Sequence, residues 1–215
     1  ILYSAFAFAG QKCSACSRLI LEDEIYDDFK QRLIEAAKSI NIGDPTDEAT
    51  SLGPVIDSSA YKTIQGYIKS GKRDGNSLLE ERDLPEGNYI SPCIIEGLDI
   101  DHKLVQEEIF GPVLVLLRAK DLDHAIELAN QCNYGLTGGL YSRSPNNIKK
   151  VTKEMQVGNF YINRPCTGAV VSRQAFGGVK ESSIGFKAGG PNYLLQFIHE
   201  KTISENTMRR GFVAE

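Results

Sequence analysis

The sequence predicts an α/β fold in which a mostly parallel open sheet carries helices on both faces. Amphipathic stretches with helical spacing alternate with short runs rich in β-branched residues, and this alternation is typical of parallel α/β sheets. The chain has 215 residues, of which 41% are hydrophobic, so it can bury a sizeable core. From residue 163 to residue 191 the alternation stops and Gly, Ser, Thr and Lys accumulate, which predicts a long functional loop near the C-terminus.

Four stretches are predicted to be helices because their apolar residues recur every three or four positions. We expect Asp23 to cap the first helix and Ser58 to cap the second. Asp121 precedes the third, and Ser144 precedes the fourth with Pro145 at its first helical position. Their apolar faces contain Tyr26, Phe29, Leu33 and Ala37, then Ile64 and Ile68, then Leu122, Ala125, Ile126 and Ala129, and finally Ile148, Val151 and Met155.

Five short runs rich in β-forming residues are predicted to be strands. They cover residues 18–21, 89–95, 113–117, 136–141 and 157–162. Each lies beside a predicted helix, so we expect them to join one sheet whose two faces the helices cover.

Charge and hydropathy exclude several classes of protein. The 24 Lys and Arg residues against 28 Asp and Glu residues give a net charge of −4, and no basic run exceeds two residues, so we expect no nucleic-acid partner. No apolar stretch approaches the roughly 20 residues that span a bilayer, and no basic start of a secretory signal is present. We therefore expect a cytoplasmic protein without a membrane span. The chain begins at Ile1 with an apolar run and no initiator Met, which we interpret as a cut end.

Cys13 is the first candidate for chemistry. It follows Gly10-Gln-Lys, a segment that can hold a thiol partly exposed, and backbone N–H groups with Lys12 would favour the reactive thiolate. The alternatives are a small buried residue, a redox pair with Cys16, or half of a zinc site. The five cysteines are irregularly spaced, no second Cys pair exists, and the three His lie far apart, so we expect reduced thiols and no metal site.

Two further segments carry candidate residues. Residues 106–112, Gln-Glu-Glu-Ile-Phe-Gly-Pro, lead into the predicted strand 113–117, and residues 176–180, Phe-Gly-Gly-Val-Lys, lie in the long loop. Taken singly, the first is typical of a solvated surface turn and the second of a tight turn beneath a core aromatic residue. Their occurrence in one chain, in this order after the Cys13 segment, is what makes them informative.

The three segments together resemble the aldehyde dehydrogenase superfamily, and the resemblance spans essentially the whole chain. It implies that Cys13 is the catalytic nucleophile, that a small aldehyde is the substrate, and that NAD is the cofactor. In the implied reaction the Cys13 thiolate attacks the aldehyde carbon, hydride leaves to the nicotinamide, and water cleaves the thioester. The resemblance also implies that Glu108 hydrogen-bonds the nicotinamide ribose and that Phe110 packs beside that ribose.

Other segments resemble one subfamily, the 1-pyrroline-5-carboxylate dehydrogenases, which oxidise L-glutamate γ-semialdehyde to L-glutamate in proline catabolism. The resemblance implies that Ser14 and the backbone of Gly168 and Ala169 anchor the substrate α-carboxylate, and that Phe176 walls its aliphatic tunnel. The matching segments are residues 13–18, 163–169, 187–194 and 205–212. The sequence departs from the family pattern beside the substrate loop, at Val179, Ser183 and Phe186.

The resemblance implies a domain organisation as well. Residues 1–195 form the thiol-bearing catalytic domain and residues 196–215 a C-terminal tail, while the NAD-binding domain is absent because no Gly-x-Gly-x-x-Gly follows a strand. The oxyanion donor Asn and the Glu-Leu-Gly-Gly base of the family are also expected upstream of this chain. We therefore expect the chain alone to be inactive and the complete protein to be a homo-oligomer.

Two other functions remain open from the sequence. One is a truncated paralogue that acts as a structural or interaction subunit, and the other is a dehydrogenase of a different aldehyde. Intact Cys13, Glu108 and Phe110 in one chain favour an enzyme over a non-catalytic paralogue. The resemblance extends both to stand-alone enzymes and to the C-terminal part of bifunctional proline-utilisation proteins.

Overall fold

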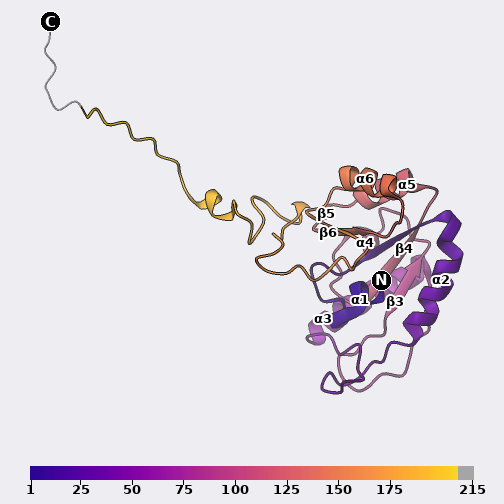
Figure 1. Cartoon of the computed structure of the whole chain (residues 1–215). Helices are drawn as coiled ribbons and strands as arrows, with labels where there is room; N and C mark the ends of the chain where they lie inside the picture. The colour runs from indigo at the N-terminus through magenta and orange to yellow at the C-terminus, as the bar shows by residue number, and fades with distance from the viewer. Residues whose placement is uncertain (208–215) are drawn as a thin grey trace, which may run out of the picture.

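The computed structural model describes residues 1–207, and residues 208–215 lie outside the described part (Figure 1). The predicted tail at 196–215 and its motif at 205–212 are therefore described only as far as residue 207. The elements in chain order are α1 (Leu2–Phe6), η1 (Ala7–Gly10), β1 (Arg18–Glu22), α2 (Asp23–Lys38), α3 (Ser58–Asp74), β2 (Asn76–Ser77), β3 (Cys93–Glu96), α4 (Lys103–Gln106), β4 (Val113–Ala119), α5 (Leu122–Asn130), β5 (Tyr134–Gly135), β6 (Thr137–Leu140), α6 (Pro145–Glu154), β7 (Asn159–Ile162), β8 (Val179–Lys180) and η2 (Tyr193–Phe197).

A four-stranded sheet in the order β1-β4-β3-β2 forms the centre of the body. Strands β1, β4 and β3 run parallel, and β2 pairs antiparallel with β3 at one edge. The predicted mostly parallel α/β sheet is confirmed. One expectation was wrong in detail, because β6 and β7 pair with each other in a separate parallel sheet instead of joining the main one.

Helices cover both faces of the main sheet, as predicted. Successive strand residues point to opposite faces, so β4 contributes Leu114 and Leu116 to one core cluster and Val113, Val115 and Leu117 to the other. The first cluster receives Tyr26, Leu33 and Ala37 from α2, and the second receives Ile64 and Ile68 from α3 and Leu128 from α5. This double coverage buries β4, and the segments that precede β1 and β4 carry the candidate motifs.

The helix starts were predicted with mixed success. Asp121 and Ser144 cap α5 and α6 through their side chains, as expected. Helix α3 is capped by Asp57, which accepts a hydrogen bond from the Ala60 N–H at 2.7 Å, so the expectation of Ser58 was wrong by one residue. The expected Asp23 cap was also wrong: Asp23 is the first helical residue of α2, and no side chain caps that helix.

Two extended regions also differ from the sequence expectation. The strand predicted at 89–95 is confined to β3, Cys93–Glu96, because Pro92 has no N–H with which to continue the ladder. The predicted long loop at 163–191 is present, but it contains the short strand β8, which pairs antiparallel with β5.

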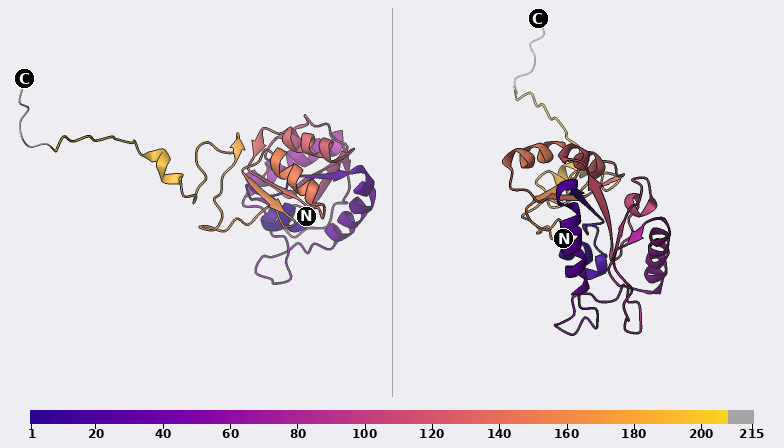
Figure 2. Two further views of the ribbon diagram at one scale, coloured as in Figure 1. Left: turned by 45° about the horizontal axis from the view of Figure 1, so that its top comes forward. Right: turned by 90° about the vertical axis from the view of Figure 1, so that its right-hand side faces the viewer.

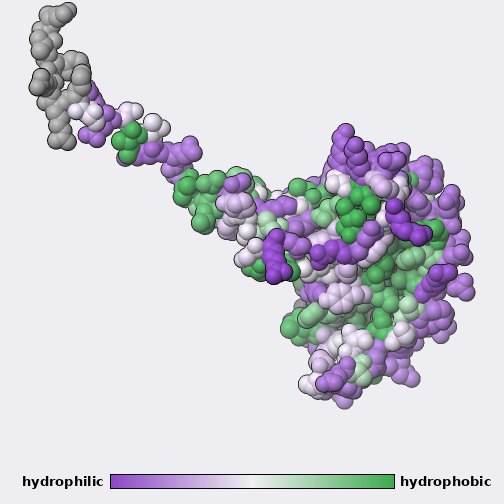
Figure 3. Space-filling view, viewed as in Figure 1, coloured by the Kyte–Doolittle hydropathy of each residue, from purple (hydrophilic) through white to green (hydrophobic). Residues whose placement is uncertain are grey.

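Beyond this loop the chain leaves the body as an extended segment that carries η2 (Figures 1 and 2). Hydrophobic side chains are exposed along it, and Figure 3 shows this apolar group at η2. They are Leu194, Leu195, Phe197, Ile198 and Ile203. Within residues 1–207, none of the helices combines the length and apolar character needed to cross a membrane.

Candidate functional site

The thiol loop, residues 10–17, joins η1 to β1 and carries Cys13 at its exposed tip. A turn surrounds Cys13, closed by a 3.0 Å hydrogen bond from the Ala15 N–H to the Lys12 carbonyl. Phe8 and Ala9, just before the loop, have positive φ angles of 56° and 54°. Such angles are costly for residues with a Cβ, and they cluster at functional sites.

The thiol loop packs directly against the Glu-Ile-Phe-Gly-Pro segment. Gly10 has a φ of +67°, and a Cβ added there would lie 2.2 Å from the Gly111 carbonyl oxygen. The two segments precede β1 and β4, which are parallel neighbours with Arg18 opposite Val115. Both motifs therefore meet at the amino ends of adjacent strands.

Cys13, Glu108 and Phe110 line one pocket of about 300 Å³. Phe110 is 42% exposed and has a φ of 55°, an uncommon angle for a bulky residue. Glu108 is exposed, and within residues 1–207 its carboxylate makes no hydrogen bond or ion pair. The pocket thus combines an accessible thiol, an unengaged carboxylate and an exposed ring.

Side-chain anchors hold both ends of the thiol loop. The Gln11 side-chain oxygen accepts a hydrogen bond from the Ile56 N–H at 2.9 Å. Arg18 donates to the carbonyls of Leu128 and Ala129 at the end of α5, each at 3.0 Å. The Lys12 ammonium lies over the rings of Phe8 and Tyr3, and its effect on the Cys13 thiol stays a prediction.

The anchor loop, residues 163–169, follows β7 and touches the thiol loop at Ser14. The buried hydroxyls of Ser14 and Thr167 form a 2.8 Å hydrogen bond. Gly168 follows with a φ of +84° and open space around it, and Ala169 is half-buried. The hydrogen bond joins the two loops that carry the predicted carboxylate-binding positions, but none of Ser14, Gly168 and Ala169 lines the 300 Å³ pocket.

Phe176 is placed differently from the other predicted residues. It forms a reciprocal backbone bridge with Ala188, each N–H donating to the other carbonyl at 2.9 Å. The neighbouring Gly177 N–H donates to the Asn159 side chain at 3.2 Å, so this loop is fixed to β7. Phe176 does not line the 300 Å³ pocket.

Several residues near the site were not singled out from the sequence. Thr167 is the partner of Ser14, and Glu181 and Ser182 line the pocket from the loop after β8. Glu107, also in the lining, accepts a 2.5 Å hydrogen bond from the Tyr67 hydroxyl, which raises the pKa of Tyr67 to about 12. No local sequence pattern links these residues, since the contacts join segments far apart in the chain.

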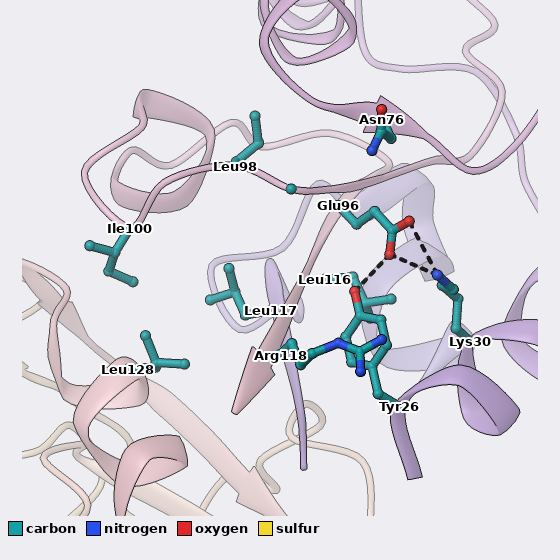
Figure 4. Close-up of a pocket in the computed structure, with 11 residues that line it drawn as sticks. Tyr26, Lys30, Asn76, Glu96, Leu98, Ile100, Leu116, Leu117, Arg118 and Leu128 are labelled. Atoms are coloured by element: carbon teal, nitrogen blue, oxygen red, sulfur yellow. Dashed lines mark hydrogen bonds and ion pairs between the residues drawn. The ribbon is translucent and has the colours of Figure 1, made fainter. Parts of the chain in front are cut away.

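A second pocket of about 490 Å³ lies at the opposite, carboxyl ends of the strands (Figure 4). Its charged side chains are paired with one another: Glu96 accepts hydrogen bonds from Tyr26 at 2.8 Å and from Lys30 at 3.1 Å. Arg118 pairs with two aspartates of α2. We favour the smaller pocket as the functional site, because it holds the accessible thiol and an unengaged carboxylate.

Among residues 1–207, no group of His, Cys, Asp and Glu side chains is arranged to hold a metal ion.

Comparison with known proteins identifies the family to which this chain is similar. The aldehyde dehydrogenase family model matches residues 1–203. A 1-pyrroline-5-carboxylate dehydrogenase of Geobacillus sp. (strain WCH70) is 48% identical over 206 residues, which are 95% of this chain and 40% of the relative. The chain thus spans about two fifths of the length of the curated relatives it matches.

Solved structures give the same result. A crystal structure of proline utilization A from Bdellovibrio bacteriovorus has a TM-score of 0.91 at 48% identity, covering 100% of this chain and 22% of that one. A 1-pyrroline-5-carboxylate dehydrogenase from Thermus, solved with bound NAD, has a TM-score of 0.85 at 40% identity and covers 91% of this chain and 38% of that one. Because the family model matches nearly the whole described chain and the relatives agree, the chain belongs to the aldehyde dehydrogenase family.

Proposed function

We propose that this chain supplies the thiol part of an NAD-dependent dehydrogenase that oxidises L-glutamate γ-semialdehyde to L-glutamate in proline catabolism. The observation that carries the proposal is the exposed Cys13 in one pocket with Glu108 and Phe110. The relatives named 1-pyrroline-5-carboxylate dehydrogenase support the choice of substrate.

The pocket fits the ribose end of a nicotinamide cofactor. The Glu108 carboxylate is exposed and unengaged, so it can accept hydrogen bonds from two ribose hydroxyls. The exposed Phe110 ring offers an apolar surface beside them. NAD, when bound, takes up the hydride that the substrate releases. The phosphates need residues outside this chain, because no glycine-rich phosphate loop occurs in it.

Cys13 is proposed as the nucleophile. Its thiolate attacks the aldehyde carbon and forms a thiohemiacetal, and the Cys13 backbone N–H donates to the developing oxyanion. The thioester that follows hydrolyses to release the acid. The tight contact between Gly10 and Gly111 fixes the thiol relative to Glu108, since neither backbone can shift without displacing the other.

The semialdehyde carries an α-carboxylate, and we assign its binding to the junction of the thiol and anchor loops. The paired Ser14 and Thr167 hydroxyls each retain further hydrogen-bonding capacity, and Gly168 presents its backbone in open space. Ala169 completes this group. The role of Phe176 as a wall of the substrate tunnel stays a prediction. Because Phe176 lies outside the lining of the 300 Å³ pocket, this role requires either that its loop moves or that the tunnel extends beyond the pocket.

The complete protein is proposed to be a homo-oligomer in the cytoplasm. The apolar side chains exposed on the extended segment, among them Leu194 and Phe197, need a partner surface, and a second copy of the chain would supply one. Sedimentation of the full-length protein tests this, and a monomer at micromolar concentration would contradict it. Residues 1–195 as catalytic domain and 196–215 as tail remain part of the same proposal.

The decisive experiment measures NADH formation by the full-length protein with two aldehydes, glutamate semialdehyde and the carboxylate-free pentanal. We expect a much higher kcat/KM for the semialdehyde and a loss of at least about a thousandfold in Cys13→Ser. Ser14→Ala should raise KM for the semialdehyde about five- to thirtyfold and leave pentanal unaffected, as removal of one hydrogen bond of about 1–2 kcal/mol predicts.

The outcomes separate the alternatives. Equal rates for both aldehydes would favour a dehydrogenase of a different substrate. No turnover by the full-length protein with either aldehyde, and unchanged properties of Cys13→Ser, would favour a non-catalytic interaction subunit. The 215 residues alone should turn over little or no substrate, because the base and the phosphate loop are expected outside them.

A further inference from the structure

The segment that carries Glu108 alternates between side chains that the body holds and side chains that stay free. Glu107 follows α4 with extended backbone, φ −97° and ψ 154°, and in extended backbone successive side chains leave the chain on opposite sides. Glu107 reaches a tyrosine of α3 and Ile109 is buried in the core, while Glu108 and Phe110 are exposed. The direction of the Glu108 side chain therefore depends on how firmly its neighbour Glu107 is held.

Tyr67 holds Glu107 from helix α3. Its hydroxyl donates a 2.5 Å hydrogen bond to the Glu107 carboxylate. This bond raises the pKa of Tyr67 to about 12, so the phenol keeps its proton and remains a donor near neutral pH. The ammonium of Lys103 lies 5.3 Å from the centre of the Tyr67 ring. Tyr67 thus contacts α4 at its first residue, Lys103, and at Glu107, which ends the helix.

The two ends of the segment are fixed by other contacts. The Gln106 side-chain amide donates to the carbonyls of Ile100 and Gln131, each at 2.7 Å. At the far end, the close approach of Gly10 to Gly111 leaves no room for either backbone to shift. Between these ends, the Tyr67 bond is the only side-chain hydrogen bond among the residues that the structure describes.

We propose that Tyr67 is a positioning residue for the cofactor, which through Glu107 holds the Glu108 carboxylate in the direction that the ribose hydroxyls require. The inference rests on the proposed function, in which Glu108 binds the ribose beside the nicotinamide. Tyr67 does not line the 300 Å³ pocket, so its effect on a ligand passes through Glu107, which does. A carboxylate that is already oriented loses less conformational freedom when the ribose binds, and this lowers the dissociation constant of NAD.

The test uses the full-length protein and three ligands, NAD, ADP-ribose and ADP, without aldehyde. ADP-ribose keeps the ribose that Glu108 is proposed to bind, and ADP lacks it. Isothermal titration calorimetry gives each dissociation constant. We expect Tyr67→Phe, which keeps the ring, to weaken the binding of NAD and ADP-ribose about three- to tenfold, as the loss of one hydrogen bond predicts, and to leave ADP binding within about twofold.

Tyr61→Phe is the matched control, because Tyr61 lies on the same helix and its hydroxyl makes no hydrogen bond within residues 1–207. It should leave all three dissociation constants unchanged. In a Glu107→Gln background, Tyr67→Phe should change NAD binding by less than about twofold, because the contact between the two residues is already weakened. In steady-state assays of Tyr67→Phe, KM for NAD should rise while kcat and KM for the semialdehyde stay within about twofold of the wild type.

The inference is overturned if Tyr67→Phe binds NAD and ADP-ribose as the wild type does, or if its binding of ADP weakens by the same factor. It is equally overturned if the wild-type protein binds no NAD, or if KM rises equally for NAD and for the semialdehyde. The proposed reaction fails in a different way. A wild-type protein that binds NAD and oxidises neither aldehyde would contradict the reaction, while the three dissociation constants would still decide the role of Tyr67.

Discussion

Replacement of Gly10 by alanine should destabilise the protein by about 2–5 kcal/mol. Alanine at a φ of +67° costs roughly 1–2 kcal/mol. The added Cβ would lie 2.2 Å from the Gly111 oxygen and 2.6 Å from the Gly111 carbonyl carbon, well inside the 3.4 Å at which ordinary contact begins. The clash is with backbone that leads directly into β4, so it cannot be relieved by a rotamer change, and overpacking of this kind costs about 1–3 kcal/mol.

The assay is urea unfolding of the purified chain followed by circular dichroism, with the free energy of unfolding extrapolated to water. Gly66→Ala is the matched control, because Gly66 lies inside α3 with nothing within 4 Å of an added Cβ. That change should stabilise by about 0.5–1 kcal/mol. If the free energy of unfolding of Gly10→Ala were within about 1 kcal/mol of the wild-type value, the close packing of the two motifs, and with it the fixed position of Cys13, would be refuted.

Three further predictions rest on individual contacts. Iodoacetamide should label Cys13 first and Cys93 last in a mass-spectrometric time course, because burial raises the pKa of Cys93 to about 11; equal rates would contradict the burial pattern. Tyr67 should titrate near pH 12 by phenolate absorbance and move toward 10 in Glu107→Gln; its raised pKa stabilises the fold below about pH 10, and this contribution is lost as pH rises through 12. Thr167→Val should cost about 1–3 kcal/mol in urea unfolding, since it leaves the Ser14 hydroxyl buried without its partner, and an unchanged midpoint would count against that hydrogen bond.

The four longer helices and the central strands of the body could be predicted because local spacing determines them, whereas the short elements α1, α4 and β2 were not predicted. The caps show the limit of this approach: Asp57 and Ser58 are both good N-cap residues, and only the folded position of the Ala60 N–H selects Asp57. The strand predicted to begin at residue 89 begins instead at Cys93. Pro92 was visible in the sequence and accounts for the late start.

The candidate site divides in the same way. Cys13, Glu108 and Phe110 could be expected together because their segments resemble the motifs of aldehyde dehydrogenases, and the structure brings them into one pocket at the amino ends of β1 and β4. The pair of Ser14 with Thr167 could not be predicted. It depends on how the chain after β7 passes the thiol loop, and the residues after Asn163 have no periodicity that fixes this path.

We place the candidate site at the amino ends of the strands because the charged side chains at the carboxyl ends are already paired with one another. Open α/β sheets usually bind ligands outside the carboxyl ends of their strands. Here Glu96 and Arg118 at those ends are engaged by side chains of α2, so a ligand there would have to displace pairs that are already formed. At the opposite ends Glu108 makes no such pair within residues 1–207, and Cys13 is exposed beside it. These contacts support the proposal that binding and reaction occur at the amino ends, where the backbone contact between Gly10 and Gly111 holds the two motifs together.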